Sequence, residues 1–271
     1  MSKSAHIRVS ELRAIHRLIG ECRERGDDPV VWRRHFLAGL GALTGGEFSV
    51  SAEIGDGTQP SRYDQGTVDC GADHGFNRAF WLQALVEFKA DAFFNPLMNS
   101  YFNRATPGIV KPRCEFVADR DWYTSFYYRG IRQTLGADAG LLCILPITGT
   151  PDDHCAVYLL RHIGARDFNG RECAITAEAM AQLTPLLGGP LTRFQEPTPT
   201  ALAPRARKVL RCLLEGDSDK EIALRLRIRP LTVNQYTKRI FEHFQVNSRT
   251  ELLTRWIRRG WPIGHWDHEP E

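Results

Sequence analysis

Two side-chain amides and one ammonium group lie close together near the C-terminal end of this 271-residue chain. Lys238 lies four residues after Asn234 and three after Gln235, a spacing that places the three side chains near one another on an α-helix. Asn and Gln amides can hydrogen-bond to N6 and N7 of adenine, while Lys can reach guanine O6 and N7 or a phosphate. These residue types at this spacing predict contact with the edges of nucleic-acid bases.

A helix over residues 230–244 would have to present these three groups. Pro230 suits the first helical position, because its missing N–H would lack an intrahelical partner there in any case. The apolar face of this helix is formed by Val233, Thr237, Ile240, Phe241 and Phe244. With one face buried, the opposite face is free for the amides and the ammonium, and such a helix has the width of the DNA major groove.

Three further helices are predicted in residues 202–260, joined by short turns. The first follows Pro204 and stops at Gly216. The second and fourth open with capping boxes, in which a serine and the glutamate three residues later satisfy each other's free backbone donors. The two boxes are Ser218 with Glu221 and Ser248 with Glu251.

Positive charge is concentrated in the same region. Residues 201–260 hold 14 Lys and Arg against 6 Asp and Glu, whereas the whole chain has a net charge of only +3. Lys220, Arg239 and Arg249 lie near predicted helix starts or flanks, where they would neutralise phosphates and add affinity without sequence information. This distribution predicts that the C-terminal region binds a polyanion. A basic helical bundle that binds another protein is the alternative.

Residues 202–260 resemble the LuxR-type helix-turn-helix DNA-binding domain. The residues that carry the resemblance fall at the family's spacing: Leu202, Pro204, Arg205, Glu215, Gly216, Lys220, Glu221, Ile222, Ala223, Thr232, Val233, Val246, Ser248, Arg249, Glu251 and Leu252. The resemblance implies a sequence-specific transcriptional regulator that binds double-stranded DNA, with Asn234, Gln235 and Lys238 as the base-reading residues.

The resemblance also implies roles for residues around the recognition helix. It places Lys220, Thr232, Tyr236, Arg239 and Arg249 near phosphates. It further implies a homodimer, joined through the fourth helix at Leu253, Trp256 and Ile257.

Several residues depart from the family's pattern. Ala203 and Arg229 stand where the family has Ser or Thr helix caps, and each lost cap should cost about 1 kcal/mol. Arg227 and Gln245 replace helix-terminating glycines, so both turns are expected to be strained or reshaped. Tyr236 replaces a frequent histidine.

The chain length and composition predict two domains of an α+β protein. An N-terminal antiparallel-sheet sensor domain flanked by helices would precede a small all-α, four-helix helix-turn-helix domain. The predicted boundaries are 1–189 for the sensor, 190–201 for a Pro- and Thr-rich linker, 202–262 for the helix-turn-helix domain and 263–271 for a flexible tail. Within the sensor, strands are predicted at 48–54, 141–147 and 155–160, a loop at 55–66, and helices from 80 to about 95 and from 171 to 187.

The aromatic segment 121–128, the strand pair and the helix after Phe168 resemble the GAF/PAS-like sensor domains attached to some LuxR-type regulators. The resemblance implies a small-molecule effector, for which Trp122 and Tyr127 are the candidate ligand-binding residues. Acyl-homoserine-lactone sensors use a Trp/Tyr/Asp set, and Trp122, Tyr127 and Asp138 supply these types at a different spacing. Aromatic residues of the core are the alternative for both candidates, and a ligand-free dimerisation or protein-docking module is the alternative for the domain.

Other function classes find no support in the residues. The seven cysteines form no C-x-x-C pair and are odd in number, which argues against a zinc module or a secreted disulfide framework. No nucleophile elbow, zinc-protease, P-loop or dinucleotide motif is present, so no enzyme, cofactor or metal site is predicted. We found no signal peptide and no apolar run long enough to cross a membrane, and therefore expect a cytoplasmic protein. Cys143 and Cys155 are expected on paired strands, as core residues or as a redox pair, and His265, Asp267 and His268 in a frayed tail.

Overall fold

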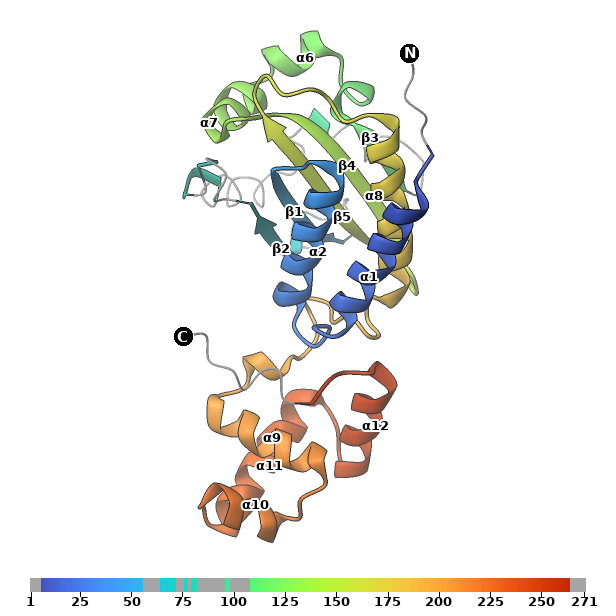
Figure 1. Cartoon of the computed structure of the whole chain (residues 1–271). Coiled ribbons are helices and arrows are strands. Elements are labelled where there is room, and N and C mark those ends of the chain that lie inside the picture. Colours follow the sequence, from blue (N-terminus) through green and yellow to red (C-terminus); the bar gives the residue numbers. More distant parts are fainter. Residues whose placement is uncertain are drawn as a thin grey trace. The chain divides into compact units, whose positions relative to one another are not determined.

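The computed structural model describes residues 6–55, 64–71, 76–77, 79–81, 96–97 and 108–263. The chain divides into two compact units (Figure 1). The first consists of Met1–Gly20 and Arg33–Leu187, and the second of Glu21–Trp32 and Gly188–Glu271. The α+β fold predicted from the sequence is confirmed, because the first unit is built on an antiparallel sheet and the helix-turn-helix region lies in the second.

A five-stranded sheet forms the centre of the first unit, with the strand order β2-β1-β5-β4-β3. All adjacent strands are antiparallel. The longest two, β4 and β5, form a hairpin with Gly149 at its tip in a left-handed conformation (φ 85°). The strands are β1 (Phe48–Ile54), β2 (Asp64–Cys70), β3 (Ile109–Pro112), β4 (Ala137–Ile147) and β5 (Thr150–His162).

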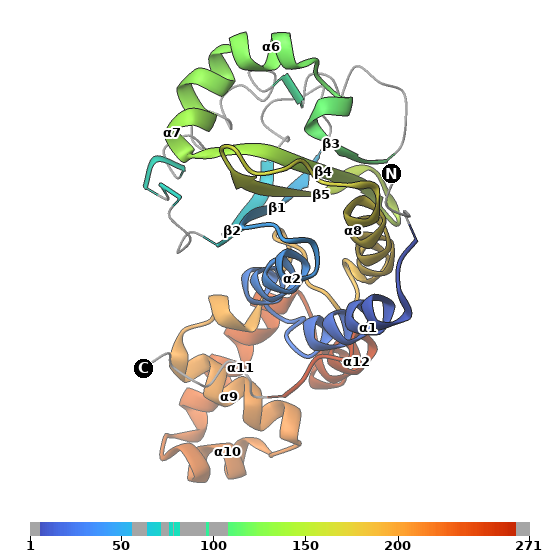
Figure 2. The same ribbon diagram turned by 45° about the horizontal axis from the view of Figure 1, so that its top comes forward.

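Helices cover both faces of this sheet. The helices α2 (Pro29–Thr44) and α8 (Gly170–Leu183) lie on one face, and α6 (Asp119–Thr124) and α7 (Gln133–Leu135) on the other (Figure 2). Helix α1 (Val9–Arg23) precedes α2 in the chain. Because side chains alternate along a strand, the register fixes which residues meet each helical layer.

The face of the sheet toward α6 is aromatic and apolar. Ala52 of β1, Ala156 of β5 and Ile144 of β4 are neighbours on this face, since Ala156 pairs with both of the others. They pack against a cluster that includes Trp122 and Tyr127. The helical turns that follow β3 therefore place the two candidate ligand-binding residues against the centre of the sheet.

The opposite face contains a fully buried ion pair. The guanidinium of Arg33 on α2 contacts the carboxylate of Glu53 on β1, and neither side chain is exposed to solvent. Glu53 lies on this face because it alternates with Ala52 and Ile54. The pair therefore joins a helix to the sheet within the first unit.

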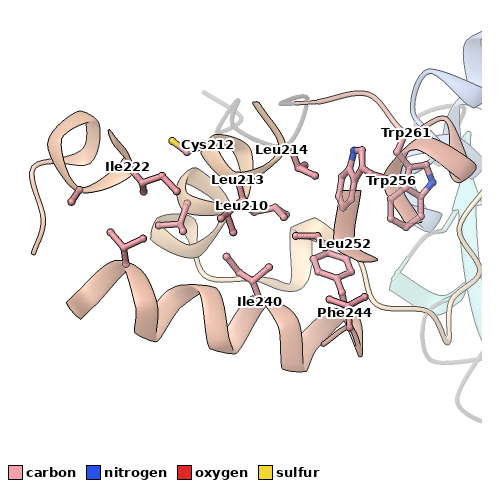
Figure 3. Close-up of a cluster of buried hydrophobic side chains, with 14 residues drawn as sticks. Leu210, Cys212, Leu213, Leu214, Ile222, Ile240, Phe244, Leu252, Trp256 and Trp261 are labelled. Carbon is pink, nitrogen blue, oxygen red and sulfur yellow. The ribbon is translucent and has the colours of Figure 1, made fainter. Parts of the chain in front are cut away.

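The second unit contains the four predicted C-terminal helices: α9 (Pro204–Glu215), α10 (Asp219–Leu226), α11 (Pro230–Phe244) and α12 (Arg249–Arg259). Their apolar faces meet in one core, in which Leu210, Ile240 and Phe244 are completely buried (Figure 3). Two tryptophans, Trp256 and Trp261, close one end of this core. The short connections predicted from Gly216 and Pro230 are present.

Residues 190–201, which the sequence pattern predicts to be a linker, pack within the second unit. Leu191 and Thr192 are completely buried. The N–H of Thr192 donates to the carbonyl of Gly26 (2.7 Å), and the indole of Trp32 donates to the carbonyl of Thr192 (3.0 Å). Leu191 and Thr192 can be buried because other parts of the unit satisfy their backbone groups, whereas Gln195, Thr200 and Ala201 are exposed. The domain boundaries drawn from the sequence stay a prediction.

The remaining element predictions vary in outcome. The strand at 48–54 is confirmed, and the strand pair at 141–147 and 155–160 forms a longer hairpin with a shorter turn than predicted. The last predicted helix of the first domain ends earlier, at Leu183. Most of the predicted 55–66 loop and of the 80–95 helix lies outside the described residues, as do His265, Asp267 and His268.

Candidate nucleic-acid interface

Helix α11 is buried on one side and exposed on the other, as its sequence pattern predicts. Val233, Ile240 and Phe244 are fully buried. Asn234, Gln235 and Lys238 are exposed, and the Lys238 ammonium lies 4.0 Å from the Glu242 carboxylate on the next turn. This ion pair is open to water and is therefore weak, so Lys238 remains available to another anion.

An open groove with a volume of about 580 Å³ runs beside the exposed face of α11. Asn234, Lys238 and Glu242 line it from the helix, and Gln245 and Asn247 line it from the turn that follows. Thr237, Phe241 and Val246 complete the lining. The groove therefore combines apolar surface with amide, ammonium and carboxylate groups that are able to hydrogen-bond to polar partners.

The helices that support α11 begin at defined caps. The Ser218 hydroxyl accepts from the N–H of Glu221, and the Glu221 carboxylate accepts from the N–H of Ser218 (2.7 Å), which confirms the first capping box. The second box is only half formed. The Ser248 hydroxyl accepts from the N–H of Glu251 (3.1 Å), but the Glu251 carboxylate accepts from the N–H of Asn247 (2.8 Å) rather than from Ser248.

The residues predicted to contact phosphates differ in how far they are exposed. Lys220 and Arg239 are exposed. Thr232 is half-buried, and Tyr236 is half-buried because its ring packs against the core of the four helices. The structure therefore presents Lys220 and Arg239 most openly.

Arg249 has a structural role that the sequence did not reveal. Its side chain is half-buried, and its guanidinium donates to the carbonyls of Leu213 (3.1 Å) and Asp217. These contacts join the start of α12 to the end of α9. A phosphate contact by Arg249 would have to share these hydrogen bonds.

Other arginines of this region are also held within the fold. Arg225 pairs with Glu215 and Asp217, with 2.8 Å between Arg225 Nη1 and Asp217 Oδ2. Hydrogen bonds from Arg211 and Arg225 hold the pKa of Glu215 below its usual value. By contrast, Arg227 and Arg229 are exposed, and neither makes an ion pair or side-chain hydrogen bond with any residue that the structure describes. The positive charge available to a ligand is therefore smaller than the residue count suggests.

The three residues predicted at a dimer seam on α12 lie in different environments. Trp256 is 3% exposed, its ring packs edge-on against Phe244 and Trp261, and its indole N–H donates to the carbonyl of Pro262 (3.2 Å). Trp256 is thus part of the core of the four C-terminal helices. An amphipathic helix such as α12 uses its apolar stripe to pack against its own domain, and only the residues beside that stripe remain for contact with a second subunit. Leu253 is half-buried and Ile257 is 78% exposed, so these two lie where a partner subunit could reach them.

The turns predicted to be strained have a left-handed backbone. Arg227 and Gln245 end α10 and α11 with φ values of 51° and 52°, and they are the non-glycine residues with positive φ in the described part of the chain. The caps predicted to be lost are indeed absent, since neither Ala203 nor Arg229 makes a side-chain cap hydrogen bond.

Replacing Gln245 by glycine should raise the free energy of unfolding of the second unit by about 1 kcal/mol. Glycine adopts the left-handed conformation without the clash between Cβ and the carbonyl oxygen that other residues suffer. Urea denaturation monitored by tryptophan fluorescence would measure the change. Gly216→Ala is the matched control, because its φ of 99° is also left-handed and the substitution should destabilise the unit. An unchanged stability for Gln245→Gly would show that this turn carries no strain.

The candidate ligand-binding residues of the first unit are in contact with each other. The ring centroids of Trp122 and Tyr127 are 5.8 Å apart, and both side chains are buried. The indole N–H of Trp122 donates to Asp138 Oδ1 (3.2 Å), and the hydroxyl of Tyr123 donates to Asp138 Oδ2 (2.9 Å). Burial and the hydrogen bond to Asp138 raise the pKa of Tyr123 to about 12, so this phenol stays protonated.

Two buried arginines complete this cluster, and the sequence did not single them out. The guanidinium of Arg113 lies 5.5 Å from the centroid of the Trp122 ring, and that of Arg132 lies 5.7 Å from it. Arg113 contacts the Asp119 carboxylate, while Arg132 donates to the Tyr158 hydroxyl (2.5 Å). Both arginines occur in turns without regular periodicity, which is why their burial could not be recognised from the sequence.

The two cysteines that the sequence predicts on paired strands are both fully buried. Cys143 and Cys155 are buried cysteines on neighbouring strands, and they are diagonal rather than opposite, because Cys143 pairs with Val157. Burial raises the pKa of Cys143, which disfavours the reactive thiolate.

Two further findings concern the part of the chain that the structure describes. None of its helices has both the length and the apolar character that a membrane span requires. It also contains no group of three or more His, Cys, Asp or Glu side chains arranged to hold a metal ion.

Comparison with known proteins identifies the C-terminal helices. Residues 200–255 match the family model described as bacterial regulatory proteins, luxR family. These residues form a LuxR-type helix-turn-helix domain. Within this LuxR-type domain, α11 is the helix that carries Asn234, Gln235 and Lys238.

Two curated proteins are similar to this chain over short stretches. The probable HTH-type transcriptional regulator GfsR of Streptomyces halstedii is 37% identical over 68 residues, which are 25% of this chain and 27% of GfsR. The transcriptional regulatory protein DesR of Bacillus subtilis (strain 168) is 38% identical over 60 residues, which are 22% of this chain and 30% of DesR. The chain thus spans less than a third of either relative.

A solved structure aligns with a larger part of the chain at lower identity. The crystal structure of the VqsR LBD domain from Pseudomonas aeruginosa covers 62% of this chain and 98% of its own, with 13% identity and a TM-score of 0.43.

Proposed function

We propose that this protein is a sequence-specific DNA-binding transcriptional regulator whose N-terminal domain senses a small molecule and controls the LuxR-type domain. The observation that carries the proposal is the exposed face of α11, where two amides and an ammonium project from a helix held by a complete hydrophobic core. Such a helix can enter the major groove and read base edges. Lys220 and Arg239 supply the sequence-independent attraction to phosphates.

A homodimer on a two-fold symmetric operator is part of this proposal. One recognition helix reads only a few base pairs, so two copies with helices about 34 Å apart would read successive major grooves. The exposed Ile257 and the half-buried Leu253 on α12 provide apolar surface for the pairing. The proposed DNA contacts are Lys220, Thr232, Tyr236, Lys238, Arg239, Asn234 and Gln235, with Arg249 in a largely structural role.

Binding of the full chain to DNA tests the proposal. A preferred duplex would be selected from a randomised library, and affinity would then be measured by fluorescence anisotropy across a range of salt concentrations. With about six phosphate contacts the log–log slope against salt should lie near −5. Absence of binding, or binding that does not change with salt, would contradict the proposal.

Variants distinguish base reading from phosphate contact. Gln235→Ala should cost about 1–3 kcal/mol on the selected duplex and relax the base preference, whereas Lys220→Ala should weaken all duplexes alike and reduce the salt slope by about one. Gln133→Ala removes an exposed amide from the first unit and is the matched control. If Gln235→Ala weakened selected and scrambled duplexes equally, α11 would not be the base-reading element.

The sensing part of the proposal is supported by the polar and aromatic cluster on the sheet. Trp122 and Tyr127 meet there beside the half-buried carboxylate of Asp138 and two buried guanidinium groups. Ligand sites commonly combine an apolar aromatic lining with a few polar groups in this way. The GAF/PAS-like character of this domain stays a prediction.

A further inference from the structure

Arg132 is a buried cation in the aromatic cluster of the first unit. It lies at the end of a π-helical turn, Tyr128–Arg132, and is 1% exposed. Its guanidinium carbon lies 4.7 Å from the ring centroid of Tyr158, 5.7 Å from that of Trp122 and 5.9 Å from that of Tyr127. Single π-helical turns of this kind occur frequently at functional sites.

The surroundings of Arg132 differ from those of the other buried arginines. Arg33 contacts Glu53, Arg113 contacts Asp119, and Arg161 lies 3.0 Å from Glu172. For Arg132, no carboxylate lies within ion-pair distance among the residues that the structure describes. Its hydrogen bond within that part of the chain runs from Nη2 to the Tyr158 hydroxyl, and its buried Nε–H has no acceptor.

This arrangement leaves a buried charge incompletely compensated. Three aromatic rings, and the hydroxyl group of one of them, Tyr158, offset part of the cost of removing the guanidinium from water. They do not supply the negative charge that the other buried arginines have, and an unpaired buried donor carries a further penalty. A buried donor without an acceptor in a native structure calls for a specific explanation, and the binding of an anion at that donor is one such explanation.

The sheet holds the cluster in place around this group. A Cβ at Gly140 on β4 would overlap the hydroxyl of Tyr158 on β5, so the glycine leaves room for the phenol. Trp122 is fixed from the other side by its hydrogen bond to Asp138. Arg132 therefore faces a preorganised wall of rings, which is how a selective site is commonly built.

We propose that Arg132 binds the carboxylate of an apolar organic acid, whose hydrophobic remainder packs against Trp122 and Tyr127. The proposal rests on the sensing role proposed above and names the ligand class of that site. The unpaired Nε–H and a neighbouring Nη–H form the planar fork that matches a carboxylate. Neutral analogues would lack the charge that Arg132 needs.

Isothermal titration calorimetry on the full chain tests this assignment with two acids and their uncharged partners. The probes are 4-phenylbutyrate and decanoate, each compared with its primary amide. We expect both acids to bind and each amide to bind about 10- to 100-fold more weakly, because charge-assisted hydrogen bonds are the stronger kind. Equal affinity for acid and amide, or no binding of either acid, would overturn the assignment.

Variants separate a ligand-binding role from a structural one. Arg132→Met should abolish the preference for the acids while leaving the unliganded protein at least as stable in thermal denaturation, since it removes a buried charge without a carboxylate partner. Arg129→Met, on the same turn but exposed, should retain the preference. A destabilised Arg132→Met protein that still prefers acids would make Arg132 purely structural. DNA binding, or a response to a neutral small molecule, would then still support the regulator.

Discussion

Replacing Glu53 by leucine is expected to lower the free energy of unfolding of the first unit by about 3–5 kcal/mol. The substitution removes the carboxylate from a pair in which both side chains are fully buried, and it leaves the Arg33 charge without that counter-ion. The cost is large because water cannot reach the guanidinium to replace the lost partner. Urea denaturation followed by circular dichroism would measure the change.

The double variant Arg33→Met with Glu53→Leu should recover most of this loss, because it removes both charges and retains apolar volume. Glu115→Gln is a control at a surface pair, since Lys111 and Glu115 are 3.3 Å apart and about half exposed. That substitution should cost less than about 1 kcal/mol. If Glu53→Leu cost no more than this control, the buried pair would not stabilise the fold.

Asp27→Asn is expected to change how stability depends on pH. Burial, with a smaller effect from the nearby Asp28 carboxylate, raises the pKa of Asp27 from 3.8 to about 7. The folded protein therefore binds this proton more tightly than the unfolded chain does. The stabilisation is complete below about pH 4 and is lost progressively as the pH rises to about 7, by up to about 4 kcal/mol in total.

In the Asp27→Asn variant this loss should disappear, so that the variant is more stable than the parent at pH 8 and shows a flatter profile between pH 4 and pH 7. Urea denaturation at each pH would give the two profiles. Asp28→Asn is the control, because Asp28 Oδ1 caps α2 by accepting from Val30 N–H (2.8 Å) and Val31 N–H (3.0 Å), and asparagine caps equally well. Parallel profiles for Asp27→Asn and the parent would contradict the raised pKa.

The helix-turn-helix region was predictable because its signals are local. The serine caps, the glycine at the end of α9 and the proline at the start of α11 all act within one helical turn. The apolar period of α11 then assigns Asn234, Gln235 and Lys238 to the exposed face. Even the two strained turns followed from the absence of glycine at Arg227 and Gln245.

The features that the sequence pattern did not indicate depend on contacts beyond a single helical turn. Thr192 is held by Gly26 and Trp32, and Trp256 packs into the core against Phe244 and Trp261. Likewise, the chain alone did not distinguish Arg249, which holds two helices together, from Arg227, which is exposed.

The sequence by itself determined which side chains lie on the exposed face of α11, because helix periodicity and capping are properties of short segments. Only the tertiary structure decided which charges remain available and which are enclosed. The Arg132 guanidinium is the clearest case, since its burial among Trp122, Tyr127 and Tyr158 arises from two helical turns folding onto a strand far along the chain. The free energy of a charged group, and the partners that it needs, depend on how far water can reach it. Access to water is set by the folded molecule and cannot be read from the residue itself.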